Sequence, residues 1–349
     1  MKFNPTNERV KHRYFRYLSN AKRLDDQTVD AAAKAIDRFE AFTDRLGFSE
    51  FRADHASAFR SHLLNEVRGN GKPLSKSTIV HTLNAVKRFF VWLPDQTGYK
   101  RLDHAWAEYF NPSLKEVAIA RATRQRRIPT LDQVRRAVGA RQPRNSIDLR
   151  DQALIALIAV TGARDNAVAS LKLKHIDTGE RMIYQDGRDV RTKFGKTIPT
   201  WFFPIAPDLE EIVVAWVKHL RVDLGFGPND PLFPASVVTF ENGRAVTSLG
   251  RDGWATAGPI RKVFKQAFES AGMYNYNPHS LRHMLVRIGM EVCVTPEEFK
   301  AWSQNLGHEG VLVTFNSYGE LPSHLQTRSA KLANGPRTTA GRSTLAMPS

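Results

Sequence analysis

Four short stretches in the C-terminal half of the chain carry side chains that could act on a phosphodiester. They are TGAR (161–164), RTKFGK (191–196), HSLRH (279–283) and LGHEGVLVTFNSYG (306–319). Each stretch alone has an ordinary structural explanation, because short motifs match by chance. Together they supply arginines, histidines, lysines and a tyrosine, and this combination indicates a site that binds a phosphate and attacks it.

The arginines and histidines of these stretches could hold the phosphate. Arg164 and Arg282 can each donate two hydrogen bonds to non-bridging phosphate oxygens, which lysine cannot reproduce. The imidazoles of His279 and His308 can donate to the same oxygens or move protons. In HSLRH the spacings i, i+3 and i+4 place His279, Arg282 and His283 on one helix face. We interpret His283 as buried support rather than as a catalyst.

The tyrosine and the lysines could carry out the covalent step. Tyr318 offers a phenol with a reference pKa of about 10, so it needs nearby positive charge or a base before it attacks. Lys193, on a predicted hairpin, suits protonation of the leaving oxygen, and Lys196 is the alternative. Tyr274 and Tyr276 are interpreted as packing or DNA-backbone residues. Since no carboxylate cluster for magnesium is found, the set predicts metal-free phosphoryl transfer through a phosphotyrosine.

Charge and composition narrow the class of partner. The 349 residues carry a formal net charge of +16 and a pI of about 10.0, which favours a polyanion, and nucleic acid first. The single cysteine, Cys293, excludes an intramolecular disulfide and a cysteine-based zinc cluster. No signal-peptide core, spanning run or lipidation signal is found. We therefore expect a soluble, cytoplasmic protein with no membrane partner.

The elements that position these residues fall into two predicted domains. Residues 1–25 are basic with interleaved aromatics, a pattern that fits either a DNA-contacting arm or a solvated helix face. Apolar residues at helical spacing then predict an all-helical domain over 26–95. Residues 96–127 lack periodicity, are rich in Arg and Lys, and are assigned to a linker.

The second predicted domain, 128–332, is helical with a small antiparallel sheet inserted. It opens with a capping box at Thr130, and an apolar helix ends at Gly162. Hairpin chemistry follows over 181–205. Further helices are predicted over 208–224, 259–271, 280–293 and 296–306. The tryptophans at 201, 216, 254 and 302 are assigned to the core, and residues 333–349 are expected to be a disordered tail.

The order Arg, Lys, His-x-x-Arg, His, Tyr resembles the tyrosine recombinase (phage integrase-like) family over most of the chain. STIVHTLNAVKRFFVWL (77–93) is similar to the family's helical core-binding domain, and 128–332 to its α+β catalytic domain. The resemblance assigns the family's roles to six residues. Arg164 is the first catalytic arginine, Lys193 the hairpin lysine, His279 and Arg282 the H-x-x-R pair, His308 the later histidine and Tyr318 the nucleophile.

The resemblance implies a site-specific recombinase or integrase, as found in mobile genetic elements. Such an enzyme cuts duplex DNA to leave a 3′-phosphotyrosine and a free 5′-hydroxyl, and it rejoins the strands without metal, ATP or another cofactor. It also implies a homotetramer on paired DNA sites, association with the nucleoid and possible accessory DNA-bending proteins. Residues 320–333 are predicted to form a short amphipathic helix that docks either on a neighbouring protomer or on its own domain.

Two features differ from the family's pattern. Ala167 stands where the family has an acidic residue, three positions after Arg164, and Asp165 is the nearby carboxylate that could replace it. The interval from His308 to Tyr318 is 10 residues, one longer than the usual spacing. Three alternatives therefore stay open: a type IB-like topoisomerase that nicks and reseals, a DNA-binding protein that has lost its reaction, and an RNA- or membrane-associated basic protein.

Overall fold

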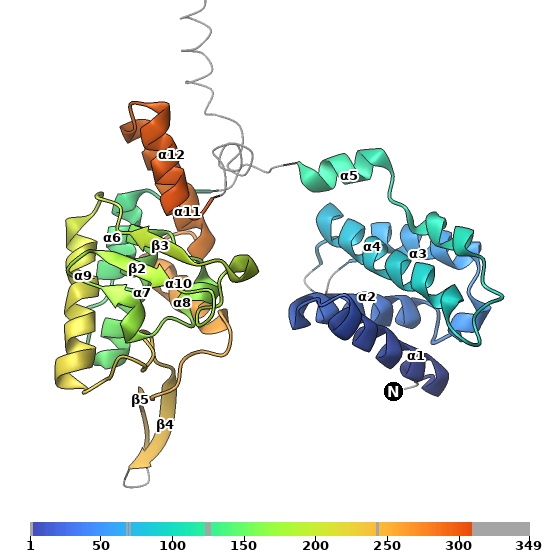
Figure 1. The fold of residues 1–349 in the computed structure, drawn as a ribbon, viewed down its shortest axis with the longest axis horizontal. Helices are drawn as coiled ribbons and strands as arrows, with labels where there is room; N and C mark the ends of the chain where they lie inside the picture. Colours follow the sequence, from blue (N-terminus) through green and yellow to red (C-terminus); the bar gives the residue numbers. More distant parts are fainter. Residues whose placement is uncertain (1–2, 68, 70, 123–126, 242–243, 309–349) are drawn as a thin grey trace, which may run out of the picture. The chain divides into compact units, whose positions relative to one another are not determined.

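The computed structural model describes residues 3–67, 69, 71–122, 127–241 and 244–308. The chain divides into two compact units, Met1–Ala122 and Thr123–Ser349, coloured blue to cyan and green to orange-red in Figure 1. Each unit has a hydrophobic core of its own. Within the described ranges, no helix is long and apolar enough to cross a membrane.

The first unit is built from helices around a core of phenylalanine rings. Side chains at the N-caps fix where two of its helices begin: Asp25 accepts from the Thr28 N–H at 2.7 Å and Ser75 from the Thr78 N–H at 3.1 Å. In the core, the rings of Phe51 and Phe90 stack with centroids 3.8 Å apart. The elements are α1 (Pro5–Arg16), η1 (Tyr17–Ala21), α2 (Asp26–Phe42), η2 (Phe48–Glu50), α3 (Ala53–Asn65), α4 (Lys76–Trp92), η3 (Leu93–Asp95), η4 (His104–Phe110) and α5 (Leu114–Arg121).

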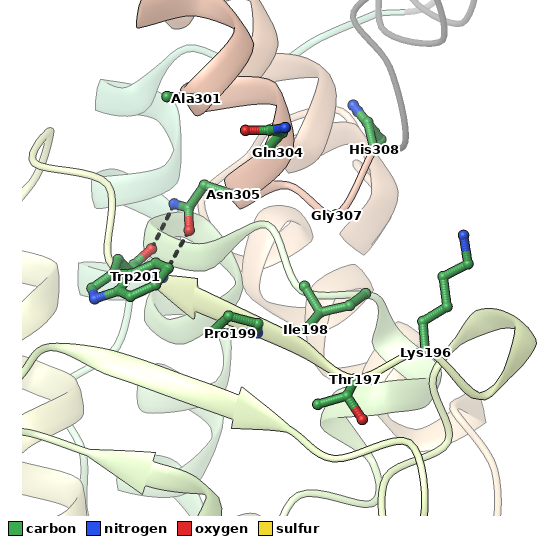
Figure 2. A pocket seen from close by; sticks show the side chains of 10 residues that line it. All are labelled: Lys196, Thr197, Ile198, Pro199, Trp201, Ala301, Gln304, Asn305, Gly307 and His308. Carbon is green, nitrogen blue, oxygen red and sulfur yellow. Dashed lines mark hydrogen bonds between the residues drawn. The ribbon is translucent and has the colours of Figure 1, made fainter.

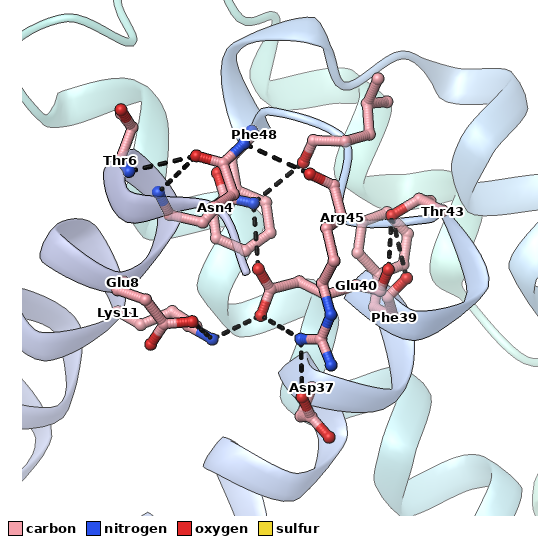
Figure 3. Close-up of polar contacts among 12 residues, drawn as sticks. Asn4, Thr6, Glu8, Lys11, Asp37, Phe39, Glu40, Thr43, Arg45 and Phe48 are labelled. Atoms are coloured by element: carbon pink, nitrogen blue, oxygen red, sulfur yellow. Dashed lines mark hydrogen bonds and ion pairs between the residues drawn. The ribbon is translucent and has the colours of Figure 1, made fainter. Parts of the chain in front are cut away.

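A buried polar network holds the N-terminal helix α1 against α2 of the first unit (Figure 3). Tyr14 of α1 lies in the core, with only 2% of its surface exposed. Glu40 on α2 is fully buried and accepts hydrogen bonds from Asn7 at 3.0 Å and Lys11 at 2.5 Å. A buried carboxylate requires such partners, because an uncompensated charge is costly away from water. One face of α1 is therefore docked, and residues 1–25 are not a free arm throughout.

Residues 96–127, assigned to a linker on the sequence, supply part of the first unit. Ala107 and Phe110 of η4 are fully buried in its core, and the Phe110 ring lies 5.6 Å from that of Phe51. Helix α5 begins with a capping box formed by Ser113 and Glu116. A short 3-10 helix repeats every three residues and shows no 3.6-residue periodicity. This explains why no helix was predicted over η4, whereas α5 buries none of its residues and so has no apolar stripe to reveal it.

The second unit surrounds one apolar helix, α7. Residues 153–161 of this helix are buried on every side, as expected for a helix that is apolar all round. Its end at Gly162 is confirmed, since Gly162 adopts the left-handed conformation with φ 62°. The helical elements are α6 (Leu131–Gly139), α7 (Ser146–Thr161), α8 (Asp165–Val168), η5 (Leu173–His175), η6 (Lys193–Gly195), α9 (Pro207–Lys218), η7 (His219–Asp223), α10 (Gly258–Ser270), α11 (Pro278–Val292) and α12 (Pro296–Asn305).

Two small antiparallel sheets accompany these helices, which confirms the predicted mainly α fold with a small sheet. The first has the order β1-β2-β3 and pairs Ile183 with Thr200. The second is a two-stranded ribbon that pairs Val238 with Thr247, and it was not predicted from the sequence. Its signal was an Asn-Gly pair between β-branched runs. The strands are β1 (Ile176–Asp177), β2 (Met182–Gln185), β3 (Ile198–Trp201), β4 (Ser236–Glu241) and β5 (Arg244–Leu249).

The tryptophans assigned to the core do not all lie there. Trp216 and Trp254 are buried, and the half-buried Trp302 donates from its indole to the Leu285 carbonyl at 2.9 Å. The prediction was wrong for Trp201, which is 50% exposed on the edge strand β3. Its position is explained by Asn305, whose amide both accepts from the Trp201 N–H and donates to its carbonyl (Figure 2). The edge of this sheet is thus paired by a side chain.

Candidate active site

Helix α11 carries the His-x-x-Arg motif in its first two turns. Asn277 caps the helix by accepting from the Ser280 N–H at 3.1 Å, and Pro278 occupies the first turn. His279 is exposed at the start, whereas Arg282 and His283 are 3% and 5% exposed. The rings of His279 and His283 meet edge to face with centroids 4.9 Å apart. The motif therefore places one histidine at the surface above a buried one.

Arg282 is held by groups from three parts of the second unit. Its Nη1 donates to the carbonyl of Gly162 at 2.5 Å, and its Nη2 donates to the carbonyl of Leu306 at 2.6 Å. The same Nη2 lies 3.0 Å from Nε2 of His308. The guanidinium thus links the end of α7, the end of α12 and His308. Three fixed contacts hold its plane in one orientation, as binding a phosphate oxygen requires.

Arg164 and His279 contribute to the same electrostatic environment. Arg164 is half-buried and stands at the N-cap of α8, two residues after Gly162. The pKa of His308 is lowered to about 4, first by burial and then by the charges of Arg282, Arg164 and His279, in that order of effect. Arg164 and His279 therefore act electrostatically on the same imidazole that Arg282 contacts. His308 is therefore neutral at pH 7.

A pocket of about 650 Å³ opens beside His308, between β3 and the end of α12. Figure 2 shows Lys196 and His308 at one end of this pocket and Trp201 with Asn305 at the other. Lys193 is exposed in the turn η6, where its ammonium lies 4.9 Å from the centroid of the Phe194 ring. The structure thus places Lys196 on the pocket wall, and Lys193 on an exposed turn three residues earlier.

Tyr318 lies outside the described residues, as do the proposed docking segment 320–333 and the tail 333–349. The other two tyrosines considered on the sequence are described. The ring of Tyr274 is stacked under Arg127 at 4.8 Å, and Tyr276 is buried with its hydroxyl 3.5 Å from Gln133. These contacts favour packing roles for both.

The position of the family's acidic residue is filled by packing. Ala167 is buried, with 1% of its surface exposed, inside the main core of the second unit. Asp165, considered as its replacement, accepts from Nε of Arg261 on α10 at 2.8 Å and from the N–H of Asn166 at 2.9 Å. Its carboxylate is therefore engaged with α10.

Several residues of the site were not identified from the sequence. Gly162 and Leu306 lie within TGAR and LGHEG, but they act through backbone carbonyls, which every residue possesses, so their role as acceptors could not be predicted from the sequence. Ser303 is buried, and its hydroxyl lies 3.4 Å from Nδ1 of His308; its signal would have been a small polar residue on the core face of a helix. As for metal ligands, no group of three or more His, Cys, Asp or Glu side chains converges in the part of the chain described.

Comparison with known proteins matches both units. The Phage integrase family model matches residues 128–318, and the phage integrase N-terminal SAM-like domain model matches residues 12–98. Tyrosine recombinase XerC of Shigella flexneri serotype 5b is 24% identical over 309 residues, covering 86% of this chain and 88% of XerC. XerC of Escherichia coli O139:H28 is 23% identical with the same coverage.

Solved structures share the fold. The XerH site-specific recombinase bound to difH substrate has a TM-score of 0.58 at 15% identity, covering 94% of this chain and 84% of that chain. The Tn1549 transposon integrase in complex with transposon right end DNA has a TM-score of 0.58 at 17% identity, covering 94% and 98%. At these identities the likeness establishes only the fold, so the chemistry must be argued from the residues of the site.

Proposed function

Because this chain belongs to the phage integrase family, we propose that it is a site-specific DNA recombinase that cuts and rejoins duplex DNA through a phosphotyrosine. The observation that carries the proposal is the arrangement around His308. Arg282 is held there by two backbone carbonyls and His308 itself, and the charges of Arg164 and His279 help to lower the pKa of His308. A cluster of cations around a neutral imidazole suits the charge that develops on a phosphate during transfer.

The arginines would bind the scissile phosphate. A guanidinium has five N–H donors, and the backbone carbonyls and His308 leave Arg282 fixed in orientation before DNA arrives. Arg164, at the N-cap of α8, would bind a second non-bridging oxygen. Since these groups need little rearrangement, their stabilisation of the transition state is not offset by a reorganisation cost.

We assign the nucleophile to Tyr318, at which the family match ends. The phenol releases its proton to solvent and its oxygen forms a bond to phosphorus as the bond from phosphorus to the 5′ oxygen breaks, and the 5′ oxygen takes up a proton. Lys193 is the proposed donor of that proton, with Lys196 on the pocket wall as the alternative. The reverse step, with the 5′-hydroxyl of a partner strand as nucleophile, joins the exchanged strands and returns the tyrosine.

The proposed substrate is duplex DNA, bound by a homotetramer on paired sites. The net charge of +16 supports binding to a polyanion with an affinity that falls as salt rises. Among the structural neighbours is a lambda integrase tetramer bound to a Holliday junction, with a TM-score of 0.53 at 16% identity. The shared fold makes such an assembly available to this chain as well.

The test is covalent trapping of the full-length chain. Duplexes from the flanks of its own gene, each nicked just 3′ of a candidate scissile phosphate, are incubated with the protein in EDTA and resolved on a denaturing gel. We expect an adduct that is lost in Tyr318→Phe and persists in Tyr274→Phe. An adduct that persists in Tyr318→Phe would overturn the assignment of the nucleophile.

Three further outcomes separate the alternatives. Resolution of a synthetic Holliday junction built from the trapped site supports recombination, whereas relaxation of supercoiled plasmid without junction resolution would identify a topoisomerase. Failure to trap any duplex, with salt-dependent DNA binding intact, would instead identify a DNA-binding protein. In that case Ala167 and the 10-residue interval from His308 to Tyr318 are the differences to examine.

A further inference from the structure

His308 lies between two polar side chains, one on each ring nitrogen. Its Nε2 is 3.0 Å from Nη2 of Arg282, and its Nδ1 is 3.4 Å from the hydroxyl of Ser303. Ser303 is 1% exposed and Arg282 is 3% exposed, so the two partners belong to the interior. The contacts therefore have a fixed geometry.

The chemistry of the partners fixes where the proton on His308 resides. A guanidinium can only donate hydrogen bonds, so Nε2 must present its lone pair to Arg282. A neutral imidazole carries a single N–H, which is then on Nδ1. That N–H points at the oxygen of Ser303, which can accept it. The contact pattern is consistent only with the Nδ1–H tautomer.

Ser303 also holds His308 through the main chain. The backbone N–H of His308 donates to the carbonyl of Ser303 at 3.2 Å, and Gly307, with φ 74°, lets the chain turn back after α12. One buried residue therefore contacts the histidine at its backbone and at its ring. Both contacts come from a helix, which positions side chains more precisely than a loop does.

We propose that Ser303 is a positioning residue that keeps His308 in the Nδ1–H tautomer, so that Nε2 accepts from Arg282 and holds its guanidinium on the phosphate site. If the hydroxyl is removed, the buried Nδ1–H loses its acceptor, and only the guanidinium still favours the Nδ1–H tautomer, so the preference becomes weaker. In the molecules that then carry the proton on Nε2, two donors face each other and Arg282 loses its contact with His308. The consequence for strand cleavage rests on the proposed function, whereas the tautomer does not.

The first experiment reads the tautomer directly. The full-length chain is labelled with ¹⁵N-histidine, and long-range ¹H–¹⁵N correlation spectra are recorded at pH 7. The His308 signals among the 11 histidines are assigned by their loss in His308→Gln. We expect wild-type His308 to be neutral with its proton on Nδ1. A charged ring, or a proton on Nε2, would overturn the proposal whether or not the chain cleaves DNA.

Variants then test whether the hydroxyl of Ser303 is the cause. Ser303→Ala should give a mixture of tautomers, and Ser303→Thr, which retains a hydroxyl, should restore Nδ1–H. Ser270→Ala is the matched control, since Ser270 is a helical serine of the same unit whose hydroxyl bonds to the Gln266 carbonyl. An unchanged tautomer in a folded Ser303→Ala would contradict the role of the hydroxyl. If Ser303→Ala does not fold, Ser303→Cys takes its place, because a thiol is a weaker acceptor than a hydroxyl and should also give a mixture of tautomers.

The cleavage assay separates positioning from folding. At saturating DNA we expect Ser303→Ala to lower the cleavage rate constant about tenfold, the lower range for partners that orient a metal-bound histidine, while the Kd for DNA changes less than twofold. Ser303→Thr should recover most of the rate. Equal loss of rate and binding would indicate a structural role and overturn the positioning role.

Discussion

Replacing Gly162 by alanine should disturb the backbone that binds Arg282, and the loss in free energy of unfolding can be calculated. Gly162 has φ 62°, a conformation that side chains disfavour, and its carbonyl accepts from Nη1 of Arg282. A Cβ built there lies 2.6 Å from Cδ2 of Leu306 and 2.8 Å from Cδ1 of Leu285. Both leucines are buried, so neither can move aside without shifting α11 or α12.

Two terms make up the expected loss of stability. The left-handed conformation costs an alanine roughly 1–2 kcal/mol, and crowding a packed interior costs about 1–3 kcal/mol more. Gly162→Ala should therefore lower the free energy of unfolding by about 2–5 kcal/mol. Gly272→Ala isolates the first term, because Gly272 has φ 67° and its Cβ would meet nothing within 4 Å. The control should lose only about 1–2 kcal/mol.

Urea unfolding of the full-length chain, followed by tryptophan fluorescence, measures both variants. The chain has two units, so the curves are fitted with two transitions and the second unit's transition is compared. Gly162→Ala should also reduce DNA cleavage more than Gly272→Ala, since only Gly162 bonds to Arg282. Equal destabilisation of the two variants, within about 0.5 kcal/mol, would refute the argument that crowding at Gly162 matters.

Two further predictions concern buried charge. Between its folded pKa of about 4 and its usual 6.5, His308 holds fewer protons in the folded chain than in the unfolded one, so stability falls as the pH drops through this window. His308→Gln should remove up to about 3 kcal/mol of that loss. The measurement is the unfolding free energy of both proteins at pH 4.5 and at pH 7, and an equal loss of stability between these pH values in the two proteins would contradict the prediction. In the first unit, Glu40→Ala removes the buried acceptor of Asn7 and Lys11 and leaves Lys11 paired with the half-exposed Glu8, so it should cost about 3 kcal/mol, the lower end for a broken buried pair. Asp37→Ala, which removes an exposed partner of Arg45, should cost less than about 1 kcal/mol, and similar losses for both would disprove the network's role.

Patterns within a few neighbouring residues were sufficient to predict those features of the fold that depend only on neighbouring residues. The capping box of α6, from Thr130 to Gln133, was predicted and is present, because both residues lie within one turn. The HSLRH face was likewise predicted from helical spacing alone. The helix ending at Gly162 follows from an apolar run and a glycine that can adopt positive φ.

Contacts between distant segments could not be obtained in this way. Arg282 is oriented by the carbonyls of Gly162 and Leu306, which lie 120 and 24 residues away in the chain. Backbone carbonyls exist at every position, so nothing in one sequence distinguishes these two. Phe110 was missed for another reason, because it joins the first core from a 3-10 helix without helical periodicity. Burial by tertiary packing decided both cases.

The depressed pKa of His308 also bears on the phenol that we propose as nucleophile. Burial, its first cause, disfavours any charged group and would raise the pKa of a phenol in the same place. The charges of Arg282, Arg164 and His279 act in the opposite direction on a phenol, because positive charge favours an anion while it disfavours a cation. The same positive charges therefore keep His308 neutral and favour the ionised form of a nearby phenol. The pKa of the phenol falls only if the effect of these positive charges is larger than the effect of burial, so the nucleophile must lie close to the cations while it is still partly in contact with water.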